Sequence, residues 1–167
     1  MQDAVVLRSG RPLTRGPFVK FDHDFIGREA LEKIAGKPKR KKVTLSWNGD
    51  DVARAFGSLF QKGNAAKYID LPLSNYSTLP NDKVLKGDKM VGVSTFSGYS
   101  YNERSMLSLA IVDVEQSEPG TEVTLVWGEE GGGSSKPVVE RHKQVHFRAT
   151  VAPAPYAEVV RSSYRPH

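Results

Sequence analysis

The second half of the chain consists of short apolar stretches separated by turn residues, and this pattern limits the fold more than any other feature. Residues 83–92, KVLKGDKMVG, predict a β-hairpin that turns at Gly87-Asp88. Residues 106–114, MLSLAIVDV, are almost continuously apolar, which predicts a central strand buried on both faces. The alternation in residues 122–127 predicts a half-buried strand. A long strand is expected over residues 138–151, with four inward side chains: Val145, Phe147, Ala149 and Val151.

The first half holds one clear strand and two short helices. Residues 41–47 alternate, with Val43, Leu45 and Trp47 on one side, which is typical of a half-buried strand. Asp50 is expected to cap a helix that continues to about residue 62. The apolar stripe of this helix is expected to be Val52, Phe56, Leu59 and Phe60. An earlier helix, from Gly27 to Ala35, should carry one apolar face formed by Ile26, Ala30, Leu31 and Ile34.

Together these elements predict a mainly β (α+β) fold, an antiparallel six-stranded barrel-like C-terminal domain preceded by two short helices. Sequential antiparallel strands with few helices limit their exposed edges most easily by closing into a small barrel or a two-sheet sandwich. The expected divisions are an irregular basic lead-in at residues 1–16, an α/β junction segment with both helices at 17–66, the barrel at 67–157 and a tail at 158–167.

The composition excludes several classes of protein. The chain has no cysteine, which rules out disulfides, zinc–thiolate sites and thiol nucleophiles. No apolar run approaches the roughly 20 residues that a membrane helix needs, and the N-terminus lacks the apolar core of a signal peptide. We therefore expect a cytoplasmic protein without membrane contact. The net charge of +5 would attract an anionic partner without identifying it.

Two patterns that suggest ligand binding fail on geometry. Residues 128–137, GEEGGGSSKP, are rich in glycine, but Pro137 and a predicted strand follow them, whereas a phosphate-binding loop needs a helix N-terminus. A hairpin loop is expected instead. His142 and His146 would share a metal ion only on a helix, because four residues of a strand span about 13 Å. Both are expected on the outward face of the strand, and we predict no metal site.

No catalytic set is recognisable in the sequence. There is no GxSxG motif of an esterase-type serine. Asp22, Asp24 and Glu29 lie close to His23 and would be compatible with an acid–base pair. Acidic residues just before and inside the first turn of a helix also complement its dipole, which explains them without catalysis.

A resemblance to a known family gives these stretches a context. Residues 22–33, DHDFIGREALEK, resemble the DFIGREAL segment of the glycine cleavage T-protein (aminomethyltransferase) family, which joins a folate-binding catalytic part to a C-terminal β-barrel. Four later stretches are similar to that family in the same order: KKVTL, MVGVSTFSGYSYNERSMLSLAIVDV, PGTEV and RATVAPAPY. A narrower resemblance, to tetrahydrofolate-dependent aromatic O-demethylases of the vanillate, syringate and 3-O-methylgallate types, is carried by KFDHDFIGREALEK, DDVARAFGSLFQKG, TLVWGEEGGGSSKPVVERHKQ and APYAEVVRSSYR.

The resemblance implies a barrel domain or subunit of a methyl (one-carbon) transferase that is not catalytic alone. Members of this family are more than twice as long as the chain, and their pterin pocket lies mainly in the N-terminal half. Tetrahydrofolate is therefore expected to bind only together with that folate-binding half, and the methoxyaromatic substrate only through the complete enzyme. The expected partner is that half or a second copy of the chain. The candidate cofactor contacts are Tyr156, Arg161, Tyr164 and His23.

Other interpretations remain open at this point. Tyr156 would equally pack against the barrel, with Arg161 and Tyr164 on a loose tail. A stand-alone basic barrel that binds an anionic ligand or RNA would suit the charge, but no aromatic residue interleaves the basic run at residues 37–42, so nucleic acid is not favoured. A self-contained enzyme would need a pocket with converging titratable groups. A transferase domain, in contrast, predicts an exposed apolar patch where its partner docks.

Overall fold

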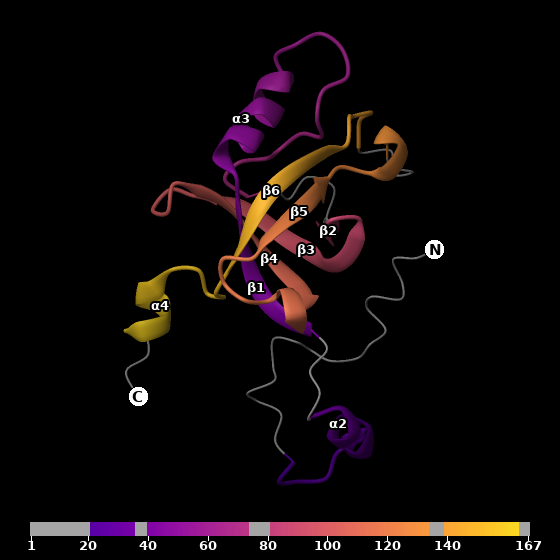
Figure 1. Ribbon diagram of the computed structural model, residues 1–167, viewed down its shortest axis with the longest axis vertical. Helices are drawn as coiled ribbons and strands as arrows, with labels where there is room; N and C mark the ends of the chain where they lie inside the picture. Colours follow the sequence, from indigo (N-terminus) through magenta and orange to yellow (C-terminus); the bar gives the residue numbers. More distant parts are fainter. Residues whose placement is uncertain (1–20, 36–39, 74–80, 134–138, 164–167) are drawn as a thin grey trace.

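Six antiparallel strands close into a barrel in the order β1-β4-β3-β2-β5-β6. The computed structural model describes residues 21–35, 40–73, 81–133 and 139–163, and Figure 1 shows the barrel between α3 and α4. The predicted fold class, a mainly β fold with an antiparallel six-stranded barrel, is confirmed, but of the described helices only α2 precedes the barrel, because α3 lies between β1 and β2. The predicted division into segments at residues 16, 66 and 157 stays a prediction.

The strands and helices have the following bounds. The strands are β1 Arg40–Trp47, β2 Asp82–Lys86, β3 Lys89–Ser100, β4 Ser105–Asp113, β5 Glu122–Trp127 and β6 Val145–Ala152. The helices are α2 Arg28–Ala35, α3 Gly49–Ser58 and α4 Glu158–Ser162, with short 3₁₀ turns η2 Val114–Gln116 and η3 Glu130–Gly132. The helices of the described segments all lack the length and hydropathy of a membrane-spanning helix.

Strand β1 closes the barrel because it pairs with β4 on one side and β6 on the other. Val43 lies opposite Ala110 of β4, and Leu45 lies opposite Val151 of β6. The predicted alternation of this strand is confirmed, since Val43, Leu45 and Trp47 are all buried. Closure leaves β1 with no free edge along residues 44–46, where both neighbours are paired.

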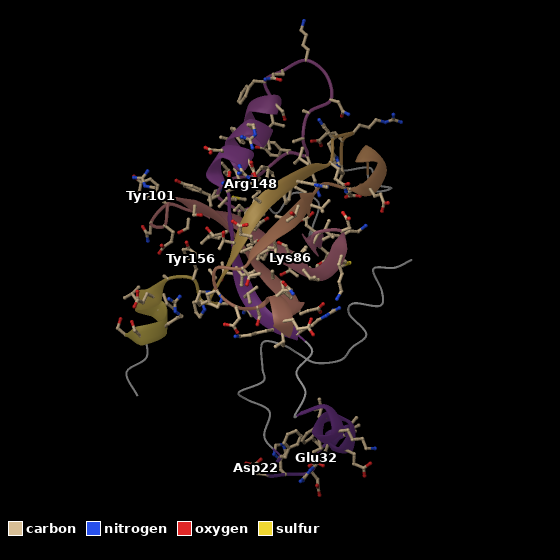
Figure 2. The ribbon with its side chains drawn as sticks, in the orientation of Figure 1. Asp22, Glu32, Lys86, Tyr101, Arg148 and Tyr156 are labelled. Carbon is tan, nitrogen blue, oxygen red and sulfur yellow. The ribbon has the colours of Figure 1, made fainter. Side chains whose placement is uncertain are left out.

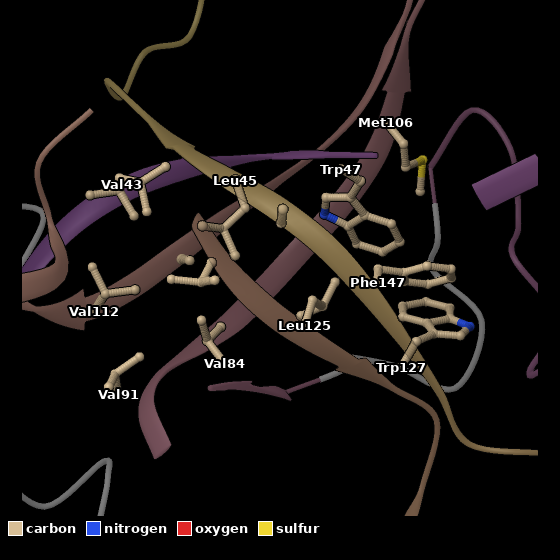
Figure 3. Packing of buried hydrophobic residues seen from close by; sticks show 14 of the residues in the cluster. Val43, Leu45, Trp47, Val84, Val91, Met106, Val112, Leu125, Trp127 and Phe147 are labelled. Carbon is tan, nitrogen blue, oxygen red and sulfur yellow. The ribbon is translucent and has the colours of Figure 1, made fainter. Parts of the chain in front are cut away.

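The interior of the barrel is filled from alternate positions of every strand (Figure 3). Its largest side chains are aromatic: the ring of Trp47 lies 5.0 Å from that of Phe147 and 5.5 Å from that of Trp127. The indole N–H of Trp47 donates to Ser108 Oγ at 3.0 Å, so its polar atom is satisfied inside the core. Burying a large apolar side chain contributes about 1.5–3 kcal/mol, and this cluster therefore stabilises one end of the barrel strongly.

Two strand predictions are wrong in detail. Strand β4 was expected to be buried on both faces, but its burial alternates: Met106, Ser108, Ala110 and Val112 point inward, and the residues between them are partly exposed. A small closed barrel has one interior, so its outer face is covered only where another segment crosses it. Strand β6 begins at Val145 instead of residue 138, although its inward side chains Phe147, Ala149 and Val151 are as predicted.

Helix α3 begins two residues earlier and ends sooner than predicted. Its N-cap is Asn48, whose side chain accepts a hydrogen bond from the Asp51 N–H at 3.1 Å, so the expectation that Asp50 is the cap is wrong. Val52 and Phe56 pack against the core as expected. The helix ends at Ser58, and Phe60, expected on the same stripe, is 81% exposed.

The face predicted for α2 is not covered by the described part of the chain. Ile26 is fully exposed, Ala30 is exposed and Leu31 is partly buried, while the side chain of Ile34 lies outside the described residues. Arg28 instead holds the start of this helix through ion pairs with Asp24 and Glu32. The packing expected of Ile26 is therefore wrong for the described residues.

Candidate functional site

A cleft of about 320 Å³ opens on the barrel surface where three elements meet. Its apolar lining comes from Val52 and Phe56 of α3, Ile69 and Leu71 of the segment at residues 69–73, and Tyr99 and Met106 of the β3–β4 hairpin. Ile69 and Met106 are buried, but Leu71 is 46% exposed and Tyr99 37% exposed. A concave surface with apolar walls and exposed apolar side chains is typical of a binding or docking site.

Arg104 lines the same cleft from the turn of the β3–β4 hairpin. Its guanidinium lies 4.1 Å from the centroid of the Tyr101 ring, and its Nη2 donates to Tyr101 Oη at 3.1 Å. The backbone φ of Arg104 is +51°, a conformation that costs a residue other than glycine about 1 kcal/mol or more. Within the described parts of the chain no carboxylate pairs with this guanidinium. Its remaining N–H groups are suited to an anionic group.

The segment at residues 69–73 forms one wall of the cleft because β3 extends beyond its neighbour β2. The N–H of Tyr99 donates to the carbonyl of Pro72 at 2.7 Å, and Leu73 forms a β-bridge with Gly98. A Cβ atom on Gly98 would lie 2.8 Å from the Pro72 carbonyl oxygen and 2.9 Å from Leu73 Cδ2. Glycine at residue 98 therefore allows this segment to approach the strand closely.

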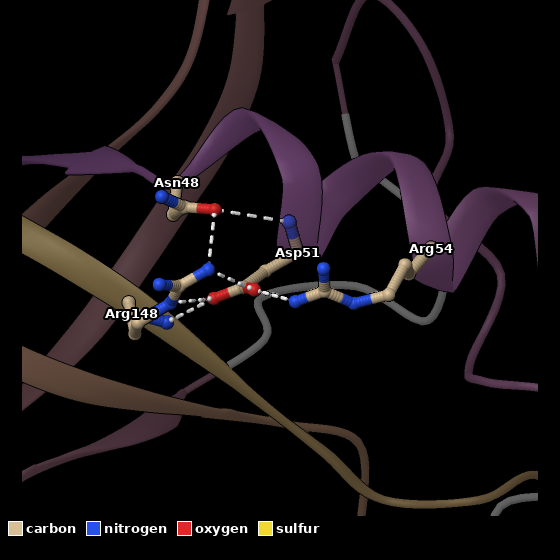
Figure 4. A network of polar contacts seen from close by, with 4 residues as sticks. All are labelled: Asn48, Asp51, Arg54 and Arg148. Carbon is tan, nitrogen blue, oxygen red and sulfur yellow. Dashed lines mark hydrogen bonds and ion pairs between the residues drawn. The ribbon is translucent and has the colours of Figure 1, made fainter.

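A network of polar contacts fixes α3, the opposite wall, to the barrel (Figure 4). Arg148 of β6 donates from Nε to Asp51 Oδ2 at 2.9 Å and from Nη2 to Asp51 Oδ1 at 2.8 Å. The Arg148 backbone N–H also donates to Asp51, and Arg54 forms an ion pair with the same carboxylate. The hydrogen bonds from Arg148 lower the pKa of Asp51 to about 2. Asp51 thus joins α3 to β6.

A second group of charged residues is buried beside Trp127, under the start of the segment that leads to the cleft. Lys67 is 3% exposed and Asp82 is 7% exposed. The Nζ of Lys67 lies 3.9 Å from Glu129 Oε1 and 5.3 Å from the Trp127 ring, whose N–H donates to the Lys67 carbonyl at 2.9 Å. Burial raises the pKa of Asp82 to about 7, although the charge of Lys67 opposes the shift.

His142 is not on the outward face of a strand, so the prediction for this residue is wrong. It is 2% exposed, its Nδ1 donates to the Glu140 carbonyl at 2.9 Å, and its Nε2 accepts the Glu129 N–H at 2.8 Å. These two bonds fix the neutral tautomer and join the turn after β5 to residues 140–144. His146 is exposed as predicted. In the described segments no three histidine or acidic side chains gather to hold a metal ion.

The predicted cofactor contacts do not form one cluster among the described residues. Tyr156 is partly buried, and Arg161 donates from Nη1 to the carbonyl of Pro155 at 2.6 Å and also to the carbonyl of Tyr156. His23 lies in the segment before α2, where its Nδ1 lies 2.8 Å from Asp22 Oδ1. Figure 2 shows Asp22 far from Tyr156. Tyr164 lies outside the described residues.

Sequence reasoning missed the cleft, Arg104, Lys67 and Asp82. The cleft had only an indirect signal, namely the exposed apolar patch expected of a docking domain. Its walls come from residues 49–56, 69–71 and 99–106, so only folding brings them together. Lys67 and Asp82 carried no signal, because charged residues are rarely buried.

No family model matches the chain, but the chain is similar to several known proteins, among them two curated relatives and one solved structure. Syringate O-demethylase from Sphingobium sp. is 52% identical over 149 residues, which cover 89% of this chain and 32% of that protein. Sesamin methylene transferase from Sinomonas sp. is 33% identical over 158 residues, 89% of this chain and 33% of that protein. The chain therefore spans about a third of the length of the curated relatives that it matches.

The solved structure is glycine cleavage system aminomethyltransferase T from Bartonella henselae. It aligns with a TM-score of 0.46 and 17% identity over 80% of this chain and 27% of that chain, a likeness too low to support any inference. The resemblance to the aromatic O-demethylases that was predicted from the sequence is confirmed by the identity to syringate O-demethylase.

Proposed function

We propose that this chain is the C-terminal barrel portion of a tetrahydrofolate-dependent one-carbon transferase of the aromatic O-demethylase type. The observation that carries the proposal is the 52% identity to syringate O-demethylase across 89% of the chain. The second relative is named a methylene transferase, which is also a one-carbon transfer. The proposed methyl donor is a methoxylated aromatic compound, and the proposed acceptor is tetrahydrofolate.

In this proposal the barrel supports a reaction centre that the folate-binding portion supplies. Cleavage of an aryl methyl ether leaves a phenolate that needs a proton donor within hydrogen-bond reach. The cleft is lined by neither a carboxylate nor a histidine, and Asp82 and Lys67 are buried outside its lining. The pterin pocket and the proton transfer are therefore assigned to the folate-binding portion, in the same polypeptide or in a partner chain.

The predicted cofactor contacts belong to the same proposal. Arg161 binds the carbonyls of residues 155 and 156, which fixes the position of the Tyr156 backbone beside the barrel. We assign cofactor contact first to Tyr156 and Arg161, and further to Tyr164 and His23. Changing Tyr156 to Phe in the complete enzyme is expected to raise KM for tetrahydrofolate more than KM for the methoxyaromatic substrate.

A chimeric enzyme tests the function. The third of the Sphingobium syringate O-demethylase that aligns with this chain is replaced by the sequence of this chain, and transfer of the methyl group from syringate to tetrahydrofolate is measured. We expect transfer, because the two sequences are 52% identical over that region. A matched chimera with Leu45→Asp, which places a carboxylate at a fully buried core position, should be inactive. A chimera that folds like the parent enzyme but transfers no methyl group would refute the proposed function.

A further inference from the structure

The apolar cleft is preformed. Its α3 wall is fixed to β6 by the Asp51–Arg148 contacts, and its second wall is fixed to β3 by the bond from Tyr99 to the Pro72 carbonyl. A group that enters such a cleft binds without ordering a loop first, and this avoids part of the entropic cost of association. The cleft therefore has the rigidity of a docking surface.

The chemistry of the lining defines what fits into the cleft. Leu71 exposes close to half of its surface and Tyr99 more than a third. An apolar side chain placed between them would therefore stabilise the complex by about 25 cal/mol for each Å² of apolar surface removed from water. Arg104 adds a guanidinium that is held against Tyr101 and has no carboxylate partner in the described parts of the chain. The surface thus matches an apolar group with a carboxylate beside it.

The length of the relatives indicates the occupant. In both curated relatives about two thirds of the protein lies outside the region that matches this chain. A portion of that size is large enough to cover the cleft, and the fully buried centre of an interface between domains is formed by apolar surface of this kind.

We infer that the cleft formed by α3, residues 69–71 and the β3–β4 hairpin is the docking site of the folate-binding portion. That portion inserts an apolar side chain between Phe56, Leu71 and Tyr99 and presents a carboxylate to Arg104. This inference rests on the proposed function, because it takes the occupant from it.

Site-specific labelling tests the docking site directly. The chain has no cysteine, so Leu71→Cys introduces one thiol at the cleft. Met90→Cys introduces a thiol at a control position of similar exposure, since Met90 is 41% exposed and Leu71 is 46% exposed. Residue 90 lies near the other end of β3, about 30 Å from Tyr99 by strand rise. The rate of thiol alkylation at each position is read by mass spectrometry in the isolated chain and in the chimeric enzyme.

The expected result is at least about tenfold slower alkylation at position 71 in the chimera than in the isolated chain, with less than about twofold change at position 90. Equal rates at position 71 in both proteins would overturn the docking site and leave the proposed function intact if the chimera is active. An inactive chimera would count against the proposed function itself. Protection of position 71 in the isolated chain, with a dimer in sedimentation, would show that a second copy is the occupant and would overturn the inference.

Arg104 gives an independent readout. Changing Arg104 to Gln removes the charge and keeps a polar side chain of similar length, and Lys86→Gln is the control because its Nζ already donates to the Glu122 carbonyl away from the cleft. In the chimera that carries Leu71→Cys, adding Arg104→Gln should speed alkylation of the thiol at position 71. The difference in rate from the chimera with Arg104 should shrink as salt is added. Equal labelling in the Arg104 and Lys86 variants would overturn the assignment of a carboxylate to the partner.

Discussion

Changing Asp82 to Asn is expected to remove a loss of stability that the chain undergoes as the pH rises towards neutral. Asp82 is 7% exposed, and burial raises its pKa from 3.8 to about 7. A carboxyl group whose pKa is higher in the folded than in the unfolded protein has its full stabilising effect below the unfolded value. That effect is lost as the pH rises through the folded value. The window therefore runs from 3.8 to about 7.

The size of the effect follows from the shift. Each pKa unit corresponds to about 1.4 kcal/mol, so a shift of about three units gives an upper limit of about 4 kcal/mol. The pKa of about 7 already includes the opposing charge of Lys67, and we expect about 2–4 kcal/mol between the ends of the window. Asn has nearly the same size, and its side-chain oxygen retains the ability to accept the hydrogen bond from the Gly128 backbone. The change therefore tests charge more than packing.

The measurement is urea unfolding of both proteins from about pH 4 to about pH 8, followed by the emission of Trp47 and Trp127, which are buried in the core. Other titrating groups are common to both proteins and cancel in the difference. The difference in the free energy of unfolding, taken as the Asn variant minus the wild type, should rise steadily with pH across the window. A difference that stays constant with pH would refute the account of a buried, protonated Asp82.

Three further substitutions test the walls of the cleft. Asp51→Ala should lower the free energy of unfolding by about 1–3 kcal/mol, because it removes the acceptor of several Arg148 hydrogen bonds. A decrease of less than about 0.5 kcal/mol in urea unfolding would contradict the importance of this network. Gly98→Ala should lower the free energy of unfolding by about 1–3 kcal/mol and speed hydrogen exchange at the Tyr99 N–H. The control Gly49→Ala should be nearly neutral, because no atom lies within 4 Å of the added Cβ. Unchanged exchange at Tyr99 would refute the close approach of residues 72–73 to Gly98. Leu71→Asp in the chimera should reduce kcat/KM for syringate by at least about tenfold while Met90→Asp leaves it within about twofold, and equal activity of the two variants would contradict the proposed use of the cleft.

The fold was predictable where the pattern of side chains is local. The alternation of Val43, Leu45 and Trp47 and the turn at residues 87–88 depend only on neighbours in sequence, and both appear in the structure. The start of α3 was missed because Asn48, Gly49 and Asp50 are all acceptable near a helix start, and the choice depends on the link between Asp51 and Arg148. The two-sided burial of β4 was overestimated because Leu107, Leu109 and Ile111 are apolar but only partly covered.

The candidate site was much less predictable than the fold. His142 looked like a surface residue because its burial depends on Gly128, whose φ of +98° turns the chain over the ring. Arg104 sits in a four-residue turn and gives no sign in the sequence that it lies beside the apolar walls. The charge of Lys67 and Asp82 argued for exposure, and only the three-dimensional packing around Trp127 places them inside.

The most direct test of the central claim is the rate of methyl transfer from syringate to tetrahydrofolate by the chimeric enzyme that carries this chain in place of its own aligned third. We expect a kcat/KM within about tenfold of that of the parent enzyme, and we expect this activity to be lost when Leu45 is changed to Asp. A chimera with the parent's thermal stability and no detectable transfer would contradict it.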